Sequence, residues 1–116
     1  MIVVAIVTGA KGKVALRLAL DTGSTGTLVD PALLASVGYD PAGSLDRRQV
    51  TTGSGVESAP RVRVDRLASL GVERYDFPVV AHTLRSGTGV DGLLGLDFLR
   101  GERLILDFRN GFLRLE

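Results

Sequence analysis

The segment "LALDTGSTGTLVD" (residues 18–30) places one aspartate, Asp21, directly after an apolar run and before a turn rich in hydroxyl groups. Aspartate, glycine, serine and threonine are common turn residues, so turn formation alone explains part of this pattern. A carboxylate held at a fixed position is also the group that general acid–base chemistry requires. Asp21 is therefore a candidate catalytic residue, and a role as a turn or cap residue is the alternative.

Two glycine-containing segments suggest a different chemistry, the binding of a nucleotide phosphate. They are "VTGAKGK" (residues 7–13) and "GTGVDG" (residues 87–92), the second of which satisfies G-x-G-x-x-G. Phosphate binding by such a turn requires a helix after the glycines, inside a βαβ unit. A strand pattern follows the first segment and only a short helical turn follows the second, so the sequence disfavours nucleotide binding.

Composition excludes several further classes of function. The chain has 116 residues, a net charge of +1, no cysteine and a single histidine, His82. These values exclude disulfides, a thiolate zinc site and a multi-histidine metal site within one chain, and they give no basic face for nucleic acid. The length suits a single domain over residues 1–116. The apolar run at residues 2–7 is too short to span a membrane and lacks the basic flank of a signal peptide, so we expect a soluble chain of unassigned compartment.

The elements that must position Asp21 are predicted to be mostly strands. β-Branched and alternating patterns indicate strands, Pro31 and Gly38 bound a helix of about two turns, and "LLGLDFL" contains a helical turn. A hairpin with the glycine-containing tip "GSG" (residues 53–55) lies in the middle of the chain, and a second hairpin closes it around "RNG". The predicted strands cover residues 2–7, 14–20, 27–29, 45–52, 56–67, 72–81, 103–108 and 112–115.

A second segment repeats the pattern around Asp21. Both "LALDTGSTGTLV" and "VDGLLGLDFL" carry an apolar run, a glycine-containing turn and another apolar run. A glycine between bulky residues allows two backbones to approach closely. Gly95 is therefore predicted to let its strand pass close to the turn that carries Asp21, although an ordinary strand-to-helix corner would give the same pattern.

Taken together, these motifs resemble a known family. Residues 21–24 resemble the Asp-Thr-Gly-Ser/Ala signature of aspartic peptidases, and "GLLGLDFL" (residues 92–99) resembles their hydrophobic-hydrophobic-glycine segment. The spacing of the two, with a glycine-tipped hairpin between them, resembles the single-lobe, retropepsin-like members. The resemblance implies a mostly β fold, a closed barrel with one or two short helices, that forms a homodimer. In it the residues of the hydrophobic-glycine motif are structural: Leu93, Leu94 and Gly95.

The activity that the resemblance implies is hydrolysis of peptide bonds in a peptide or protein substrate. Two carboxylates share one proton and activate a water molecule, because like charges in contact cannot both ionise. One chain supplies one such aspartate, so the homodimer would bring together two copies of Asp21. The resemblance implies neither a metal nor a cofactor.

The resemblance also implies roles for the neighbours of Asp21. Thr22 would form a hydrogen bond with the partner chain, the backbone N–H of Gly23 would reach the Asp21 carboxylate, and the Ser24 hydroxyl would donate to its outer oxygen. A flap that closes over the substrate would be formed by Thr52, Gly53, Ser54 and Gly55, together with Thr51.

The chain departs from the retroviral pattern at two positions. Thr25 and Leu96 stand where many retroviral enzymes have an aspartate and an arginine that pair near the subunit interface, and Asp97 follows instead. Asp97 is interpreted as a turn or cap residue, with support of the site as the alternative. Asp91 is also interpreted as a turn or cap residue. We interpret Asp107 as a strand-end residue and His82 as a surface or loop residue. A module that keeps this fold for dimerisation or peptide binding, without catalysis, is the alternative function.

Overall fold

The computed structural model describes residues 1–84 and 88–116 of the chain. Its helices are α1 (Pro31–Ser36), α2 (Leu96–Leu99) and the 3₁₀ helix η1 (Pro41–Gly43). Its strands are β1 (Ile2–Gly9), β2 (Gly12–Leu20), β3 (Leu28–Val29), β4 (Arg47–Thr52), β5 (Gly55–Ser69), β6 (Val72–Ala81), β7 (Gly92–Leu94), β8 (Leu104–Asp107) and β9 (Phe112–Leu115).

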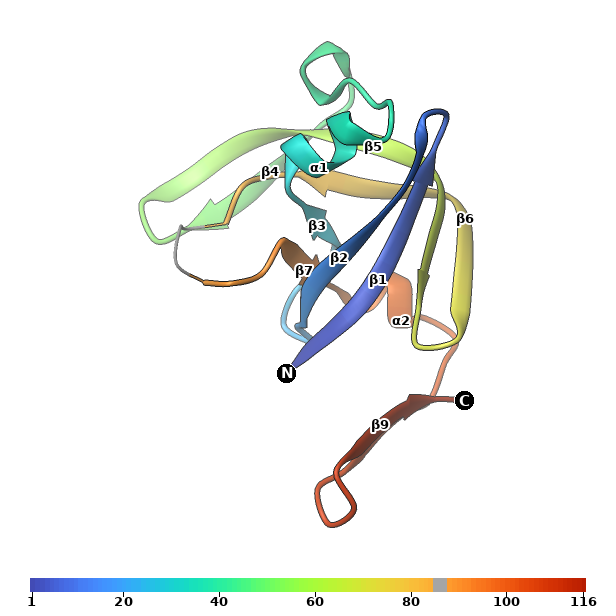
Figure 1. The fold of residues 1–116 in the computed structure, drawn as a ribbon. Helices are drawn as coiled ribbons and strands as arrows, with labels where there is room; N and C mark the ends of the chain where they lie inside the picture. Colours follow the sequence, from blue (N-terminus) through green and yellow to red (C-terminus); the bar gives the residue numbers. More distant parts are fainter. Residues whose placement is uncertain (85–87) are drawn as a thin grey trace.

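The main sheet closes on itself to form a barrel (Figure 1). Its strand order is β1-β2-β7-β3-β6-β5-β4, and an additional antiparallel pairing between β1 and β5 joins the two sides. The first half of β5 leaves the barrel to form a hairpin with β4. The predicted mostly β, closed barrel with one or two short helices is therefore confirmed, and the predicted homodimer stays a prediction.

The barrel interior follows from the alternation of side chains along the strands. In β1 every second residue is buried, namely Val3, Ala5 and Val7, while the residues between them face outward. Burial of each valine- or leucine-sized side chain contributes about 1.5–3 kcal/mol relative to leaving it exposed. From α2, Phe98 enters this core and its ring meets that of Phe77 edge-on, with 5.9 Å between the ring centroids.

Parallel pairing brings the two motifs of the sequence together. β2 pairs in parallel with β7, which sets Leu20 beside Leu94 and leaves the turn after β2 next to the turn after β7. β7 also pairs with β3, so close that a Cβ atom on Gly92 would lie 1.9 Å from the carbonyl oxygen of Leu28. Only glycine fits at this crossing.

Local signals determine helix α1, and long-range hydrogen bonds hold the segment before β7. Asp30 caps α1 by accepting a hydrogen bond from the Ala32 N–H, and Pro31 occupies the first helical position, as predicted. Asp91 exchanges hydrogen bonds with the backbone of Arg17 on β2, 74 residues away, and so ties the start of β7 to β2; its interpretation as a turn or cap residue stays a prediction. In the described residues no helix is both long and apolar enough to cross a bilayer.

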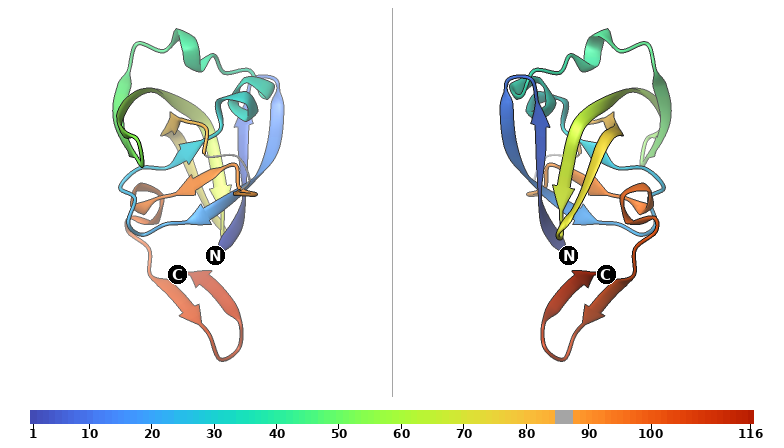
Figure 2. Two further views of the ribbon diagram at one scale, coloured as in Figure 1. Left: turned by 90° about the vertical axis from the view of Figure 1, so that its left-hand side faces the viewer. Right: turned by 90° about the vertical axis from the view of Figure 1, so that its right-hand side faces the viewer.

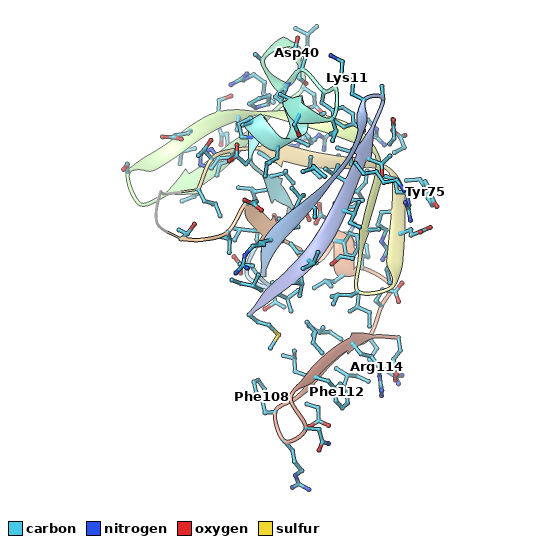
Figure 3. The ribbon with its side chains drawn as sticks, in the orientation of Figure 1. Lys11, Asp40, Tyr75, Phe108, Phe112 and Arg114 are labelled. Atoms are coloured by element: carbon cyan, nitrogen blue, oxygen red, sulfur yellow. The ribbon has the colours of Figure 1, made fainter. Side chains whose placement is uncertain are left out.

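The C-terminal hairpin of β8 and β9 projects from the barrel as a separate two-stranded sheet (Figures 1 and 2). Asp107 ends β8 and accepts hydrogen bonds from the backbone and the side chain of Asn110, which confirms its strand-end role. Phe108 and Phe112 lie on this hairpin apart from the barrel (Figure 3), and Phe108 is 83% exposed.

Candidate active site

One cavity of about 780 Å³ opens beside the turn that follows β2. Its lining combines this turn with the start of β3, the β4–β5 hairpin, the end of β6 and the segment after it. The lining residues used below are Asp21, Gly23, Ser24, Thr27, Arg48, Val50, Thr51, Gly53, Arg61, His82, Leu93 and Asp97.

Asp21 is held at this cavity by backbone hydrogen bonds. Its N–H donates to the carbonyl oxygen of Leu94 (3.0 Å), which ties the turn to β7. One carboxylate oxygen, Oδ1, accepts a hydrogen bond from the Gly23 N–H (2.9 Å), as the resemblance implied. The half-buried carboxylate therefore has a fixed orientation at the cavity wall.

The hydroxyl groups of the turn are arranged differently from the expectation. The Ser24 hydroxyl donates to the carbonyl oxygen of Gly26 (2.7 Å) rather than to Asp21, so the predicted contact with the outer carboxylate oxygen is wrong. The physical reason is proximity within the turn, because a hydroxyl has only one proton to donate. Thr22 is exposed on the surface of the chain, and its hydrogen bond with a partner stays a prediction.

A buried network that the sequence did not reveal supports the turn from behind. Thr27 is fully buried, its hydroxyl donates to Asp97 Oδ1 (2.7 Å), and its N–H donates to Asp97 Oδ2 (3.1 Å). The N–H of Phe98 also donates to Asp97 Oδ1 (2.8 Å). Asp97 therefore lies in the first turn of α2, where Gly95 and not Asp97 is the N-cap, and it also fixes the strand that follows the Asp21 turn. The only signal for Thr27 was a single polar residue before the apolar Leu28 and Val29.

The predicted close approach of Gly95 to the Asp21 turn is confirmed. A Cβ atom on Gly95 would lie 2.6 Å from the carbonyl oxygen of Gly26 and 2.9 Å from that of Ser24. The Gly95 N–H donates to the Thr27 hydroxyl (3.1 Å). Of the other two motif residues, Leu94 is fully buried in the core and Leu93 lines the cavity.

The β4–β5 hairpin borders the same cavity. Its register pairs residue 52 with Gly55, which leaves Gly53 and Ser54 at the tip. Gly55 has a φ of +128°, a conformation that favours glycine. Thr51 and Gly53 line the cavity, so the structure brings this part of the predicted flap to the site of Asp21.

Three basic residues of the cavity were not singled out as site residues from the sequence. His82, expected to be a surface or loop residue, follows β6 as a half-buried lining residue, and its N–H donates to the Val29 carbonyl oxygen (3.1 Å). Arg48 from β4 and Arg61 from β5 also line the cavity. Both arginines lie in alternating polar strands, where sequence alone cannot tell the cavity side from the solvent side.

The competing chemistries find little support in the structure. The first glycine-rich segment forms the tight turn between antiparallel β1 and β2, so no helix follows it. The second begins at residue 87, outside the described residues, and its last glycine starts β7. Within residues 1–84 and 88–116, no three histidine, aspartate or glutamate side chains are grouped closely enough to hold a metal ion.

Comparison with known proteins agrees with this geometry. The family model described as "Aspartyl protease" matches residues 4–98, a stretch that contains both the Asp21 turn and Gly95. The chain matches no curated protein sequence. Its fold is similar to the crystal structure of a retropepsin-like aspartic protease from Rickettsia conorii, with a TM-score of 0.65 and 18% sequence identity over 92% of this chain and 83% of that one. The chain therefore belongs to the aspartyl protease family and has a retropepsin-like fold.

Proposed function

We propose that this protein is an aspartic endopeptidase whose active site forms in a homodimer, with Asp21 contributed by each subunit. The carrying observation is the placement of Asp21: a carboxylate oriented by backbone hydrogen bonds at the wall of a cavity of about 780 Å³. A cavity of this size falls within the usual range of ligand-binding sites. The bordering β4–β5 hairpin provides a flap.

The requirement for a second subunit rests on a count of carboxylates. Among the described residues, Asp97 is the other acidic residue that lines the cavity, but its oxygens already accept three hydrogen bonds from Thr27 and Phe98. These contacts hold the Asp97 carboxylate against Thr27 and α2, and in the described residues no hydrogen bond joins it to Asp21. The second catalytic carboxylate must therefore come from another copy of the chain.

The proposed reaction uses the two Asp21 side chains in complementary protonation states. The ionised carboxylate accepts a proton from water as the water oxygen attacks the peptide carbonyl carbon. The protonated carboxyl donates its proton to the carbonyl oxygen. As the tetrahedral intermediate collapses, the carboxyl that took the water proton gives it to the leaving nitrogen, and the other carboxylate takes back a proton from a hydroxyl of the intermediate. The pair titrates as a unit, because each charge shifts the other. The hairpin carrying Thr51 and Gly53 excludes bulk water when it closes.

The C-terminal hairpin is the surface that we assign to the second copy. The N-terminus adjoins the Asp21 turn, since the Leu20 N–H donates to the Met1 carbonyl oxygen (2.9 Å), and the hairpin projects from this end of the barrel (Figure 2). Leu104, Leu113 and Leu115 pack the hairpin against the barrel core, while Phe108 in its turn and Phe112 on β9 stay exposed. These two aromatic side chains gain burial in a dimer that also completes the site.

The test combines an activity assay with sedimentation. Asp21→Asn is expected to abolish cleavage of an unstructured protein at mildly acidic pH and to preserve the circular dichroism spectrum. Asp65→Asn makes the same chemical change at an exposed carboxylate on β5 and is expected to leave cleavage unchanged. Sedimentation is expected to show a dimer. Equal cleavage by wild type and Asp21→Asn, or activity in a strict monomer, would refute the proposal.

A further inference from the structure

The cavity has a basic side whose charge is only partly neutralised. Arg48 and Arg61 line it from neighbouring strands, and both form ion pairs with the same carboxylate, that of Asp46. One negative charge therefore faces two positive charges. Glu57 lies across the hairpin from Val50, but it is exposed, and in the part of the chain that the structure describes it neither pairs with Arg48 nor lines the cavity.

Asp46 is committed mainly to Arg61. The Arg61 Nε donates to Asp46 Oδ2 at 2.5 Å, and the Arg61 N–H donates to the Asp46 carbonyl oxygen at 2.7 Å. The Ser44 hydroxyl holds the Arg61 carbonyl oxygen from the other side (2.6 Å). These contacts fix Arg61 as part of the wall, with its charge balanced by Asp46.

Arg48 is much less constrained. Its Nη1 lies 3.6 Å from Asp46 Oδ1 and 3.3 Å from the Arg47 carbonyl oxygen, and its side chain is 50% exposed. An exposed ion pair of this kind contributes little free energy. In the described part of the chain, both contacts of the Arg48 guanidinium use the same nitrogen. Its Nε and Nη2 groups thus keep donors for a carboxylate in the two-point geometry that arginine favours.

The surface next to Arg48 is apolar. Val50, two residues further along β4, points to the same face and packs against the cluster of Leu28, Ala59 and Val80. Leu28, Val50 and Val80 all line the cavity. An apolar wall that ends at a cation matches a side chain with a short hydrocarbon stem and a terminal carboxylate, which is the structure of glutamate.

We infer that the cavity selects substrates carrying an acidic side chain, with Arg48 as the specificity-determining residue and glutamate as the preferred side chain. This inference rests on the proposed function, because it assigns the cavity to a peptide. Arg48 binds the carboxylate, Val50 contacts the stem, and Arg61 with Asp46 provides a neutral, rigid neighbour.

Peptide profiling measures this selection directly. Wild-type protein is incubated with a peptide library, and the cleaved products identify any position enriched in glutamate. Two peptides that differ only in Glu or Gln at that position are then compared by kcat/KM. We expect a preference for Glu of about tenfold, since hydrogen bonds to charged groups contribute about 1.5–3 kcal/mol and this site is partly exposed. High salt is expected to reduce it.

Variants assign the preference to Arg48. Arg48→Gln is expected to give equal kcat/KM values for the Glu and Gln peptides. Arg48→Glu is expected to cleave a peptide with lysine at that position in preference to the Glu peptide. Arg47→Gln is the matched control, because Arg47 is the preceding residue of β4 and its guanidinium donates to Ser58 instead. It is expected to retain the full ratio. Cleavage without an acidic preference, or a preference that survives in Arg48→Gln, would overturn the inference while the peptidase function stands.

A binding experiment separates the inference from catalysis. Short fluorescein-labelled peptides of alanine, valine and leucine, with one central Glu or Gln, are titrated with Asp21→Asn protein by fluorescence anisotropy. Tighter binding of the Glu peptide, lost when Arg48→Gln is added to Asp21→Asn, supports the inference even if no cleavage is detected. Equal binding of the two peptides, or no binding of either, contradicts it.

Discussion

Substitution of Asp97 by alanine tests whether the buried network behind the Asp21 turn stabilises the fold. The change removes the acceptor of three hydrogen bonds, from the Thr27 hydroxyl (2.7 Å), the Thr27 N–H (3.1 Å) and the Phe98 N–H (2.8 Å). Thr27 is fully buried, so water cannot replace the lost acceptor at its N–H without rearrangement.

The expected magnitude follows from the cost of unpaired buried groups. A buried donor left without an acceptor costs about 1–3 kcal/mol, and the Thr27 N–H is such a donor. The Thr27 hydroxyl still accepts a hydrogen bond from the Gly95 N–H but loses the acceptor for its own proton. Loss of the acceptor at the Phe98 N–H costs less, because this N–H lies at the start of α2. We therefore expect Asp97→Ala to lower the free energy of unfolding by about 2–4 kcal/mol.

Urea unfolding followed by circular dichroism measures this loss at one fixed protein concentration, since assembly affects apparent stability. Asp97→Asn keeps one acceptor oxygen and should lose less than Asp97→Ala. Thr27→Val removes the hydroxyl from the other side and should cost less in the Asp97→Ala background than in wild type. A loss below about 0.5 kcal/mol for Asp97→Ala would refute the assigned role, because exposed positions give changes of that size.

Three further changes have outcomes that the structure determines. Gly95→Ala places a methyl group 2.6 Å from the Gly26 carbonyl oxygen and should sharply reduce the melting temperature, whereas Gly26→Ala, with open space at its Cβ, should not. Backbone and side-chain hydrogen bonds from Asn110 lower the pKa of Asp107 below its usual 3.8. The stability that these bonds contribute is therefore present above pH 3.8 and is lost as the pH falls through the pKa of Asp107 in the folded protein. Asn110→Ala should raise the Asp107 pKa in an NMR titration. Ser24→Ala should leave the acid limb of the kcat/KM profile unchanged, and a shift of that limb would contradict the Ser24–Gly26 contact.

Much of the architecture was predictable because it depends on local patterns. The apolar, mostly β-branched run of β1 and the turn residues Asp30 and Pro31 determine their elements with little help from the rest of the chain. The approach of Gly95 to the Asp21 turn was also predictable, since a glycine between bulky residues often marks a place where two backbones meet closely. These features reflect steric requirements that any fold of this sequence must meet.

The direction of polar side chains could not be predicted in the same way. The Ser24 hydroxyl had acceptors on both sides, and the choice of Gly26 over Asp21 depends on the turn geometry. Thr27 and Asp97 are 70 residues apart, and their contact requires the parallel pairing that brings β7 beside β2. Arg48 and His82 can be recognised as cavity residues only from the folded barrel, because segments far apart in the sequence line the cavity together.

The geometry of the turn also explains why one chain contains half of the proposed site. In the described residues, Asp21 Oδ1 accepts the Gly23 N–H, while Oδ2 has no hydrogen-bond donor from the same chain. An outer oxygen without an internal donor is available to a water molecule or to the proton of a second carboxyl group. Asp97, which could have been that second carboxyl, is instead engaged by three donors from Thr27 and Phe98. The same buried network that supports the turn therefore keeps Asp97 out of the proposed catalytic pair, so the proposed pair needs a second copy of Asp21.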